Sequence, residues 1–368
     1  MKIMLVIHSM MAGGAERVAA TLVNYWTAQG EQVTLLTVAS SAADFYDLDP
    51  RINRIGLDLG GPSPGWRRFV ASNFRIIRGI RSAIRGVRPD VVLSFMDVVN
   101  LRVLLAAAGT GVPVVVEEHT DPTVYSIGSM RAALRRLLYP RASALVVLTE
   151  RIAEWAKEIV SESSVRVIPN PVGDQFLMGR AAAQQCAHTA VAVGRLVSEK
   201  GFDLLLRAFA QCAQTHPDWR LQIVGEGPER TNLKRLGDEL GIGGRVELAG
   251  AVKETQVALQ QSDLFVLSSR FEGFPMALLE AMACGLPVIS FDCRSGPREM
   301  IQDGVNGRLV PPNDVAALAA AMSQLMGSGD ERARLGQRAA AAAERFRLGR
   351  IDQMWRSVFE QALSSAQT

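Results

Sequence analysis

The chain has 368 residues, of which 48% are hydrophobic and 21% are charged, and its formal net charge is +3. This length exceeds one ordinary hydrophobic core and predicts two α/β domains, while the composition excludes a disordered chain. Since no uncharged apolar run reaches about 18 residues, the sequence also excludes a membrane-spanning helix.

Residues 1–7 (MKIMLVI) predict a first strand, because the segment has neither the length nor the cleavage site of a signal peptide. Two adjacent glycines, Gly13 and Gly14, then lead to a helix expected over residues 15–29. This strand–turn–helix unit is typical of nucleotide-binding folds, but the glycines lack the spacing of a dinucleotide fingerprint. Two interpretations stay open: a tight turn that needs a positive φ, or close approach of the backbone to a ligand.

A second strand is expected over residues 32–38, and Asp47 and Asp49 follow it in a loop. Their spacing resembles the metal-binding DxD of one class of transferases. A hard divalent cation needs more oxygen ligands than such a pair supplies, so we expect a solvated loop and no metal.

Residues 66–87 predict a long amphipathic helix, with apolar residues along one side and arginines along the other. The stretch 66–88 contains no acid, and its basic residues are Arg67, Arg68, Arg75, Arg78, Arg81, Arg85 and Arg88. Either these arginines are simply solvated, or they contact anionic lipid headgroups or the diphosphate of a lipid. A second basic stretch, with Arg131, Arg135, Arg136 and Arg141, favours the membrane.

Further strands are expected over residues 90–95, 112–118, 144–148 and 165–168. His119 directly follows the second of them, at the carboxyl end of a parallel strand, where open α/β sheets bind ligands. A functional role for His119 is therefore favoured over a structural one.

A segment rich in Ala and Gln, residues 180–189, predicts an interdomain linker. A strand over residues 189–193 then runs into the turn GRLVSEKG, in which Arg195 and Lys200 suit the binding of phosphate oxygens. Later strands, each followed by a helix or a turn, begin near residues 221, 246, 264, 288 and 307. This alternation predicts a second parallel sheet.

The stretch 270–300 carries two acids, Glu272 and Glu280, at the start of a predicted helix and about two turns into it. Pro275 suits the first helical turn, and Gly285 suits the left-handed position after the helix. The free amides of the first turn form a ready phosphate site, beside which the carboxylates could bind hydroxyls.

The four cysteines show neither CxxC spacing nor histidine partners, which predicts free thiols in a reducing cytoplasm. They are Cys186, Cys212, Cys284 and Cys293.

These motifs carry a resemblance to a known family. EGFPMALLE is an E-x7-E motif, and together with VGRLVSEKG, VGEGPE, GGAER and AMACGLPVIS it resembles the retaining family-4 glycosyltransferases of GT-B fold. Within that family, GGAER, SFMD with Asn100, and EEHTDP are most similar to bacterial transferases of lipid-linked oligosaccharide, O-antigen or exopolysaccharide synthesis.

The resemblance implies an α/β architecture of two Rossmann-like domains facing a cleft. The N-terminal domain would span residues 1–172 and serve the acceptor and membrane side. The donor domain would span residues 173–345, and a C-terminal helix, residues 346–368, would cross back to the first domain.

The resemblance also implies site residues. Arg195 and Lys200 would bind the donor diphosphate, Glu280 the ribose and Glu272 the donor sugar. His119 would face the sugar from the other domain. The remaining implied donor contacts, which line the cleft, cover the base or approach the phosphate and sugar, are Gly13, Gly14, Val252, Gly273, Phe274, Pro275 and Met276.

The implied reaction transfers a hexose or N-acetylhexosamine from a UDP-sugar to a polyprenyl-diphosphate-linked glycan, with front-face attack and retention. It needs no metal and no cofactor beyond the UDP-sugar co-substrate, and no nucleic-acid partner is expected. The enzyme would lie in the cytoplasm, peripheral on the inner face of the cell membrane. Two alternatives remain: the same fold acting on a soluble sugar, and a catalytically silent scaffold protein that binds nucleotide-sugars.

Overall fold

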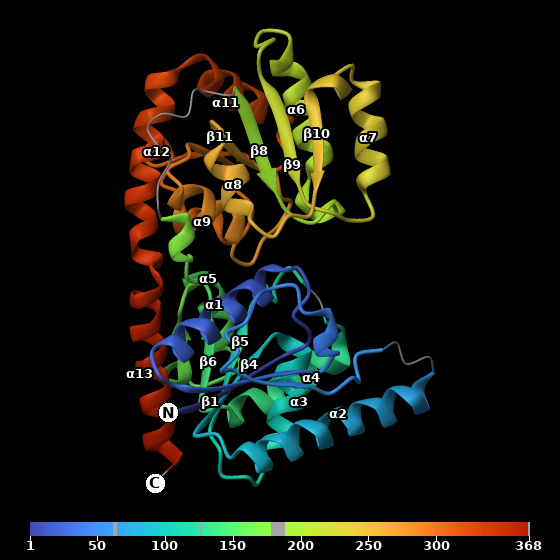
Figure 1. The fold of residues 1–368 in the computed structure, drawn as a ribbon, viewed down its shortest axis with the longest axis vertical. Helices are drawn as coiled ribbons and strands as arrows, with labels where there is room; N and C mark the ends of the chain where they lie inside the picture. The colour runs from blue at the N-terminus through green and yellow to red at the C-terminus, as the bar shows by residue number, and fades with distance from the viewer. Residues whose placement is uncertain (62–64, 126, 178–187, 367–368) are drawn as a thin grey trace. The chain divides into compact units, whose positions relative to one another are not determined.

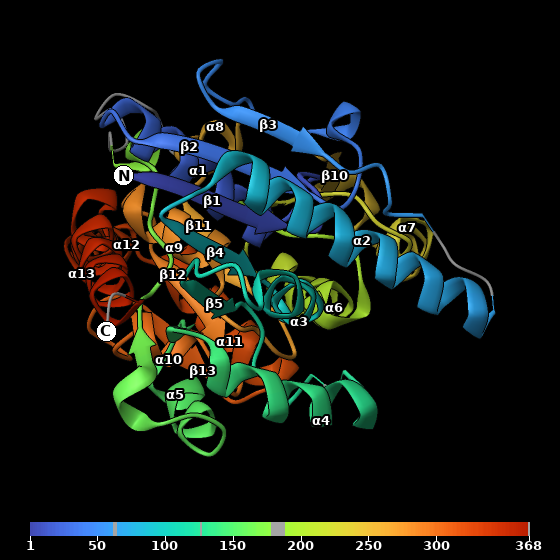
Figure 2. The same cartoon turned by 90° about the horizontal axis from the view of Figure 1, so that it is seen from below.

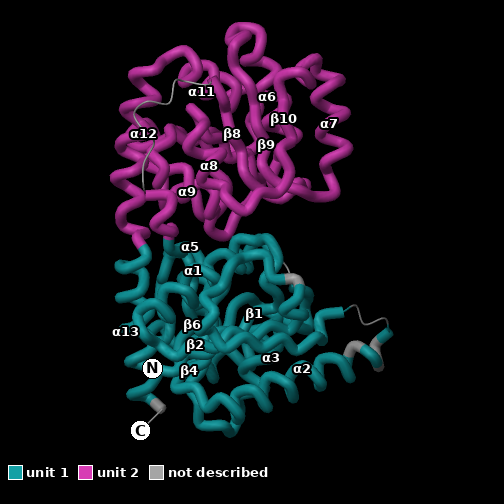
Figure 3. Tube along the Cα trace, viewed as in Figure 1, with its two compact units in different colours: residues 1–171, 348–368 teal, residues 172–347 magenta. Residues whose placement is uncertain are grey.

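The computed structural model describes residues 1–61, 65–125, 127–177 and 188–366. The chain forms two compact units (Figure 3): unit 1 comprises residues 1–171 and 348–368, and unit 2 comprises residues 172–347. Of the predicted linker, residues 180–189, the structure describes only residues 188 and 189. Cys186 lies outside the described residues.

Unit 1 is built on a parallel sheet that has seven strands in the described part of the chain, in the order β3-β2-β1-β4-β5-β6-β7. The strands are β1 (Lys2–Ile7), β2 (Gln32–Thr37), β3 (Asn53–Gly56), β4 (Val91–Phe95), β5 (Val114–Glu118), β6 (Ala144–Val147) and β7 (Val165–Val167). Strands β4 and β5 are buried along their length, and β1 is buried except at Lys2, because helices cover the sheet.

The helices of unit 1 are α1 (Gly14–Ala28), α2 (Trp66–Val87), α3 (Asp97–Ala107), α4 (Ser129–Leu138), α5 (Glu150–Lys157) and α13 (Leu348–Ala366). Helix α3 packs against α2 and against α4 (Figure 2). Ile76, Ile80 and Ile84, spaced one turn apart on α2, are buried in the core of the sheet. The predicted amphipathic helix at residues 66–87 therefore exists, and its apolar side packs on its own unit.

The C-terminal helix α13 packs in unit 1. Trp355 and Phe359 contact the ring of Trp26 on α1, with ring centroids 6.5 and 5.6 Å away. The Trp26 indole also donates a hydrogen bond to Asp352 over 2.8 Å. These contacts attach the end of the chain to its beginning.

Unit 2 contains a second parallel sheet, with six strands in the described residues and the order β10-β9-β8-β11-β12-β13. Its strands are β8 (Thr189–Val193), β9 (Arg220–Val224), β10 (Val246–Gly250), β11 (Leu264–Leu267), β12 (Val288–Phe291) and β13 (Arg308–Val310). Its helices (Figure 1) are α6 (Phe202–Ala213), α7 (Arg230–Glu239), α8 (Thr255–Gln260), α9 (Met276–Ala283), α10 (Pro297–Met300), α11 (Val315–Gly327) and α12 (Gly329–Ala343). Two parallel-sheet, Rossmann-like units confirm the predicted α/β class.

Among the described residues, no helix has both the length and the apolarity needed to cross a bilayer. Cys212, Cys284 and Cys293 are buried, and Cys212 and Cys293 are free thiols.

Candidate active site

The strongest candidate site lies at the carboxyl ends of β8 and β11 in unit 2. Lys200 ends the turn after β8, and Glu272 lies in the loop between β11 and α9. Lys200 Nζ donates to Glu272 Oε1 over 2.6 Å, and the hydroxyl of Ser269 donates to the same oxygen, also over 2.6 Å. The fold thus joins two residues that the sequence analysis had assigned separately, and it adds Ser269, which that analysis did not select.

Two side chains of the β11–α9 loop bind backbone carbonyls of the turn that carries Lys200. The hydroxyl of Ser268 donates to the carbonyl of Lys200 over 2.9 Å. Arg270 donates to the carbonyl of Ser198 over 2.6 Å and forms a two-bond pair with Asp203, over 2.9 and 2.8 Å. Burial opposes ionisation of Asp203, but the hydrogen bonds from Arg270 outweigh it and hold the pKa of that carboxyl below its usual value.

The close approach of these two loops explains a glycine. Gly201 has φ +62°, and a Cβ at this position would lie 2.1 Å from the carbonyl oxygen of Ser268. Any other residue would push the turn that carries Lys200 away from the loop that carries Glu272.

The mouth of helix α9 is supported by the segment after β12. The hydroxyl of Ser295 donates to the carbonyl of Gly273 over 3.3 Å. Gly296, at φ +94°, lies so close to Pro275 that a Cβ would be 2.5 Å from its ring. Pro275 itself is the residue before the first turn, not within it as predicted, and its carbonyl accepts from the amides of Leu278 and Leu279.

The other predicted donor residues of unit 2 lie around this edge of the sheet. Arg195 is exposed in the turn after β8, Met276 is half-buried at the start of α9, and Phe274 is buried. Val252 is half-buried in the loop after β10. Glu280 is entirely buried in α9, four residues beyond the start of that helix.

The glycines of the turn after β9 serve backbone packing. A Cβ on Gly225 would lie 1.8 Å from the carbonyl oxygen of Gly194, and one on Gly227 would lie 2.4 Å from that of Leu196. The amide of Leu196 donates to the carbonyl of Glu226 over 2.8 Å. The turns after β8 and β9 therefore lie against each other.

In unit 1, His119 follows β5 and is held by two neighbours. Its Nε2 lies 3.4 Å from a carboxylate oxygen of Glu117, and its ring packs on Phe95 with centroids 4.5 Å apart. The side chain is only 6% exposed. Only a small part of the His119 side chain is therefore accessible to a ligand.

A buried polar network lies beside His119. Glu118 accepts from the hydroxyl of Tyr139 and pairs with Arg135, whose Nε is 3.2 Å from the carboxylate. Asn100 donates to the carbonyl of Glu117 over 2.9 Å and to the Tyr139 hydroxyl over 3.2 Å. Burial raises the pKa of Glu118 to about 7, although Arg135 and Tyr139 act in the opposite direction.

This network corrects one prediction. Arg135 was grouped with surface arginines of a membrane-facing stretch, but it is 4% exposed and paired with Glu118 and Asp97. Helix periodicity alone does not reveal carboxylates on β5 and α3 that attract this side chain inward.

The structure contradicts one of the two interpretations of Gly13 and Gly14, the tight turn that needs a positive φ. Neither Gly13 nor Gly14 has a positive φ; Gly13 is extended at −167°. The amide and carbonyl of Gly13 instead bond the hydroxyl of Tyr46, over 3.2 and 2.8 Å. The tight-turn explanation is therefore wrong, and the role of ligand approach stays a prediction.

The DxD-like pair is used locally. Asp49 pairs with Arg51 over 2.6 Å, and the hydrogen bonds from Arg51 lower the pKa of Asp49 to about 2. Across the described ranges, no group of three or more His, Cys, Asp or Glu residues could hold a metal ion.

Most of the arginines of α2 are accessible. Those with exposed side chains are Arg68, Arg75, Arg78 and Arg85, and Arg88, directly after the helix, is exposed as well. Arg81 differs, because it donates to the carbonyls of Ala106 and Ala108 over 2.9 and 2.7 Å and so caps the end of α3. The side chain of Arg67 lies outside the described part of the structure.

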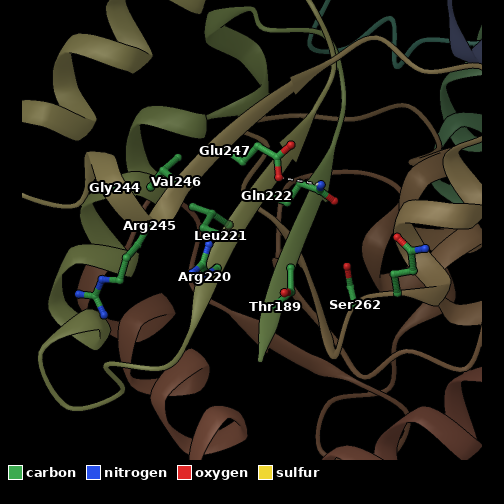
Figure 4. A pocket seen from close by; sticks show the side chains of 10 residues that line it. Thr189, Arg220, Leu221, Gln222, Gly244, Arg245, Val246, Glu247 and Ser262 are labelled. Carbon is green, nitrogen blue, oxygen red and sulfur yellow. Dashed lines mark hydrogen bonds between the residues drawn. The ribbon is translucent and has the colours of Figure 1, made fainter. Parts of the chain in front are cut away.

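A cavity of about 420 Å³ lies at the opposite end of the unit 2 sheet (Figure 4). Its lining includes Thr189, Arg220 and Val246, the first residues of β8, β9 and β10. Gln222 donates to Glu247 over 3.0 Å across two of these strands. The cavity contains none of the predicted site residues, and ligands of open parallel sheets bind at the other end.

Two Rossmann-like units, with the Lys–Glu pair at a helix mouth in unit 2, are the arrangement expected of a GT-B glycosyltransferase. Sequence models of two families match the chain: "Glycosyltransferase Family 4" over residues 12–176 and "Glycosyl transferases group 1" over residues 182–342. The chain belongs to the family-4 glycosyltransferases of GT-B fold.

Several individual proteins are similar to this chain. An exopolysaccharide phosphotransferase of Streptomyces coelicolor is 34% identical over 77% of this chain, which covers only 30% of that protein. A Campylobacter jejuni enzyme is 25% identical over 96% of this chain and 97% of its own length; it is named an α-1,4-N-acetyl-D-galactosaminyltransferase acting on a GalNAc-containing diNAcBac-PP-undecaprenol. The structure of Anabaena HepE in complex with UDP has the same fold, with a TM-score of 0.80, 19% identity and coverage of 98% of this chain and 100% of that one.

Proposed function

We propose that the protein is a retaining glycosyltransferase that moves a hexose or N-acetylhexosamine from a UDP-sugar to a polyprenyl-diphosphate-linked glycan. The observation that carries the donor half of this proposal is the pairing of Lys200 with Glu272 beside the start of α9. A cation, a carboxylate and the start of a helix are then available within one small region for a diphosphate and a sugar.

The chemistry follows from these groups. As the glycosidic bond breaks, negative charge grows on the departing diphosphate, and Lys200, Arg195 and the first amides of α9 would stabilise it. Lys200 must then exchange Glu272 for the diphosphate. Glu272 remains held by Ser269 and would turn to the hydroxyls of the donor sugar, while Glu280 would bind the ribose.

Retention would occur by front-face attack, in which the acceptor hydroxyl attacks the anomeric carbon as the diphosphate leaves. The proton of that hydroxyl passes to a phosphate oxygen. The positive, oxocarbenium-like ring would be steadied by the nearby negative phosphate, so no covalent sugar–enzyme intermediate is required. His119 is the residue of unit 1 that we assign to the donor sugar.

The acceptor assignment rests on unit 1. The exposed arginines of α2 suit the anionic inner face of the cell membrane, where lipid-linked glycans are displayed. The name of the Campylobacter relative includes an undecaprenyl-linked substrate, which supports the same acceptor class. We therefore propose that the protein is a peripheral cytoplasmic enzyme of glycan or exopolysaccharide assembly.

A thermal-shift screen tests the donor. We expect UDP and UDP-sugars to raise the melting temperature, because a ligand of the native state stabilises it by mass action. Lys200→Ala should lose most of this shift, whereas Arg207→Ala, on the exposed side of α6, should keep it. A shift by ADP- or GDP-sugars alone would refute the uridine assignment, and no shift by any nucleotide-sugar would refute the function.

A further inference from the structure

The carboxyl ends of β4 and β5 bring three side chains of unit 1 to one face of its sheet. Phe95 and Glu117 are paired across these neighbouring strands (Figure 2), and His119 follows Glu117 by two positions. Since side chains along an extended chain alternate between the two faces, Glu117 and His119 share a face with Phe95, and Glu118 belongs to the other. The contacts agree, because His119 packs on Phe95 whereas Glu118 binds Tyr139.

The backbone of Glu117 is fixed by α3 and by the residue before it. The amide of Met96 donates to the Glu117 carbonyl over 3.1 Å, and the side chain of Asn100 donates to the same oxygen over 2.9 Å. Asn100 is itself fully buried. The side chain of Glu117 therefore starts from a backbone that is held on two sides.

The carboxylate of Glu117 faces a buried ring nitrogen of His119. The two atoms, Oε2 of Glu117 and Nε2 of His119, are 3.4 Å apart, and both side chains are almost completely buried. Within the part of the chain that the structure describes, neither atom has a hydrogen-bond partner. A buried polar atom without a partner is costly, which favours the pairing of these two atoms.

This pairing determines where His119 carries its proton. An ionised carboxylate only accepts hydrogen bonds, so Nε2 must supply the N–H. In a neutral imidazole the other ring nitrogen, Nδ1, then has a free lone pair and accepts a hydrogen bond. Because Nε2 is buried against Glu117, Nδ1 is the ring nitrogen that remains for a ligand.

We propose that Glu117 is a positioning residue that holds the proton of His119 on Nε2, so that Nδ1 accepts a hydrogen bond from a hydroxyl of the donor sugar. A group that only accepts, such as a phosphate oxygen or the carbonyl of an N-acetyl group, does not suit this nitrogen. The inference rests on the proposed function, in which His119 contacts the sugar. It adds the partner residue and the protonation form that this contact requires.

Nitrogen NMR of isotope-labelled protein tests the position of the proton. At about pH 8, where an ordinary histidine is neutral, we expect the His119 proton on Nε2 in the parent protein. Glu117→Gln keeps an oxygen acceptor and should keep this form. Glu117→Leu removes the acceptor and should move the proton at least partly to Nδ1.

Two results of this measurement would overturn the assignment. One is a proton on Nδ1 in the parent protein, alone or together with a proton on Nε2, and it does not depend on the folding of any variant. The other is a ring that is unchanged in Glu117→Leu, because Glu117 would then not hold the proton.

Calorimetry with UDP-glucose, UDP-N-acetylglucosamine and UDP tests the consequence for the sugar. We expect Glu117→Leu to bind the tighter of the two UDP-sugars about tenfold more weakly than the parent protein, and Glu117→Gln to stay within about threefold. Both variants should bind UDP within about twofold of the parent value. In a His119→Ala background, Glu117→Leu should cause no further loss, because Glu117 acts through that ring.

The outcomes separate this inference from the proposed function. Equal losses for UDP and the UDP-sugar, equal losses in Glu117→Leu and Glu117→Gln, or a full further loss in the His119→Ala background would contradict a positioning role while leaving the function intact. If the parent protein binds neither UDP nor a UDP-sugar, the proposed function fails, and the contact of His119 with the sugar fails with it.

Discussion

Lys200 and Glu272 are 72 positions apart in sequence, yet their charged groups meet over 2.6 Å at the carboxyl ends of β8 and β11. The proposed donor diphosphate must therefore compete with Glu272 for the ammonium of Lys200. Ser269 keeps a hydrogen bond to the same carboxylate oxygen and would hold Glu272 in place after the exchange.

Ser269→Ala should separate sugar binding from nucleotide binding. Without the hydroxyl, Glu272 loses its fixed orientation, so we expect affinity for the UDP-sugar to fall about tenfold while affinity for UDP stays within about twofold. Calorimetry with both ligands measures this. Ser262→Ala, which removes another buried hydroxyl of unit 2, should change neither affinity. An equal loss for UDP and UDP-sugar would indicate general damage and argue against a positioning role.

Gly201→Ala should destabilise unit 2 and weaken nucleotide binding. The new Cβ would meet the Ser268 carbonyl at 2.1 Å and would also strain a residue at φ +62°. Gly241 is the matched control, because it has φ +71° but nothing within 4 Å of its Cβ position. We expect Gly201→Ala to lower the free energy of unfolding by about 1–3 kcal/mol more than Gly241→Ala, as measured by urea unfolding. Equal losses would mean that the loops separate without cost.

The free energy of unfolding should depend on pH through Glu118. Its folded-state pKa is raised from 4.5 to about 7, so the folded protein retains a proton that the unfolded chain has lost. This contribution to stability is fully present below about pH 4.5 and disappears as the pH rises to about 7. In Glu118→Gln, stability should fall less steeply across this window than in the parent protein, whereas Glu154→Gln, at an exposed position, should keep the parental slope. A parental slope in Glu118→Gln would contradict the assignment.

Binding to anionic vesicles should depend on the exposed arginines of α2. Each contributes up to ~1 kcal/mol at low salt, so replacing Arg75, Arg78 and Arg85 together by Gln should weaken flotation with such vesicles by about two orders of magnitude. The control replaces three exposed cations of unit 2: Arg207, Lys234 and Arg338. If both triple variants float equally well, α2 does not contact the membrane and the soluble-acceptor alternative gains support.

Much of the fold follows from local pattern. Apolar runs mark the buried central strands, and the isoleucines of α2 repeat at the helical period. Strand β3 was not predicted, because its four residues at a sheet edge are only half-buried or exposed and show little hydrophobic pattern.

The site was predicted only in its parts. The motifs select Lys200 and Glu272, but nothing local places them in contact. The pair of Arg270 with Asp203, the burial of Arg135 and the use of Arg81 as a helix cap all join residues from separate elements. Such contacts are properties of the folded chain, so residue type and spacing do not reveal them.

The most direct test is transfer of a labelled sugar from a UDP-sugar to a polyprenyl-diphosphate-linked glycan, with the anomeric configuration of the product determined by NMR. We predict a product that retains the donor configuration, and values of kcat/KM about 10²–10³-fold lower in Lys200→Ala and Glu272→Gln but unchanged in Arg207→Ala. An inverted product, or undiminished transfer by the folded Lys200 and Glu272 variants, would contradict the account.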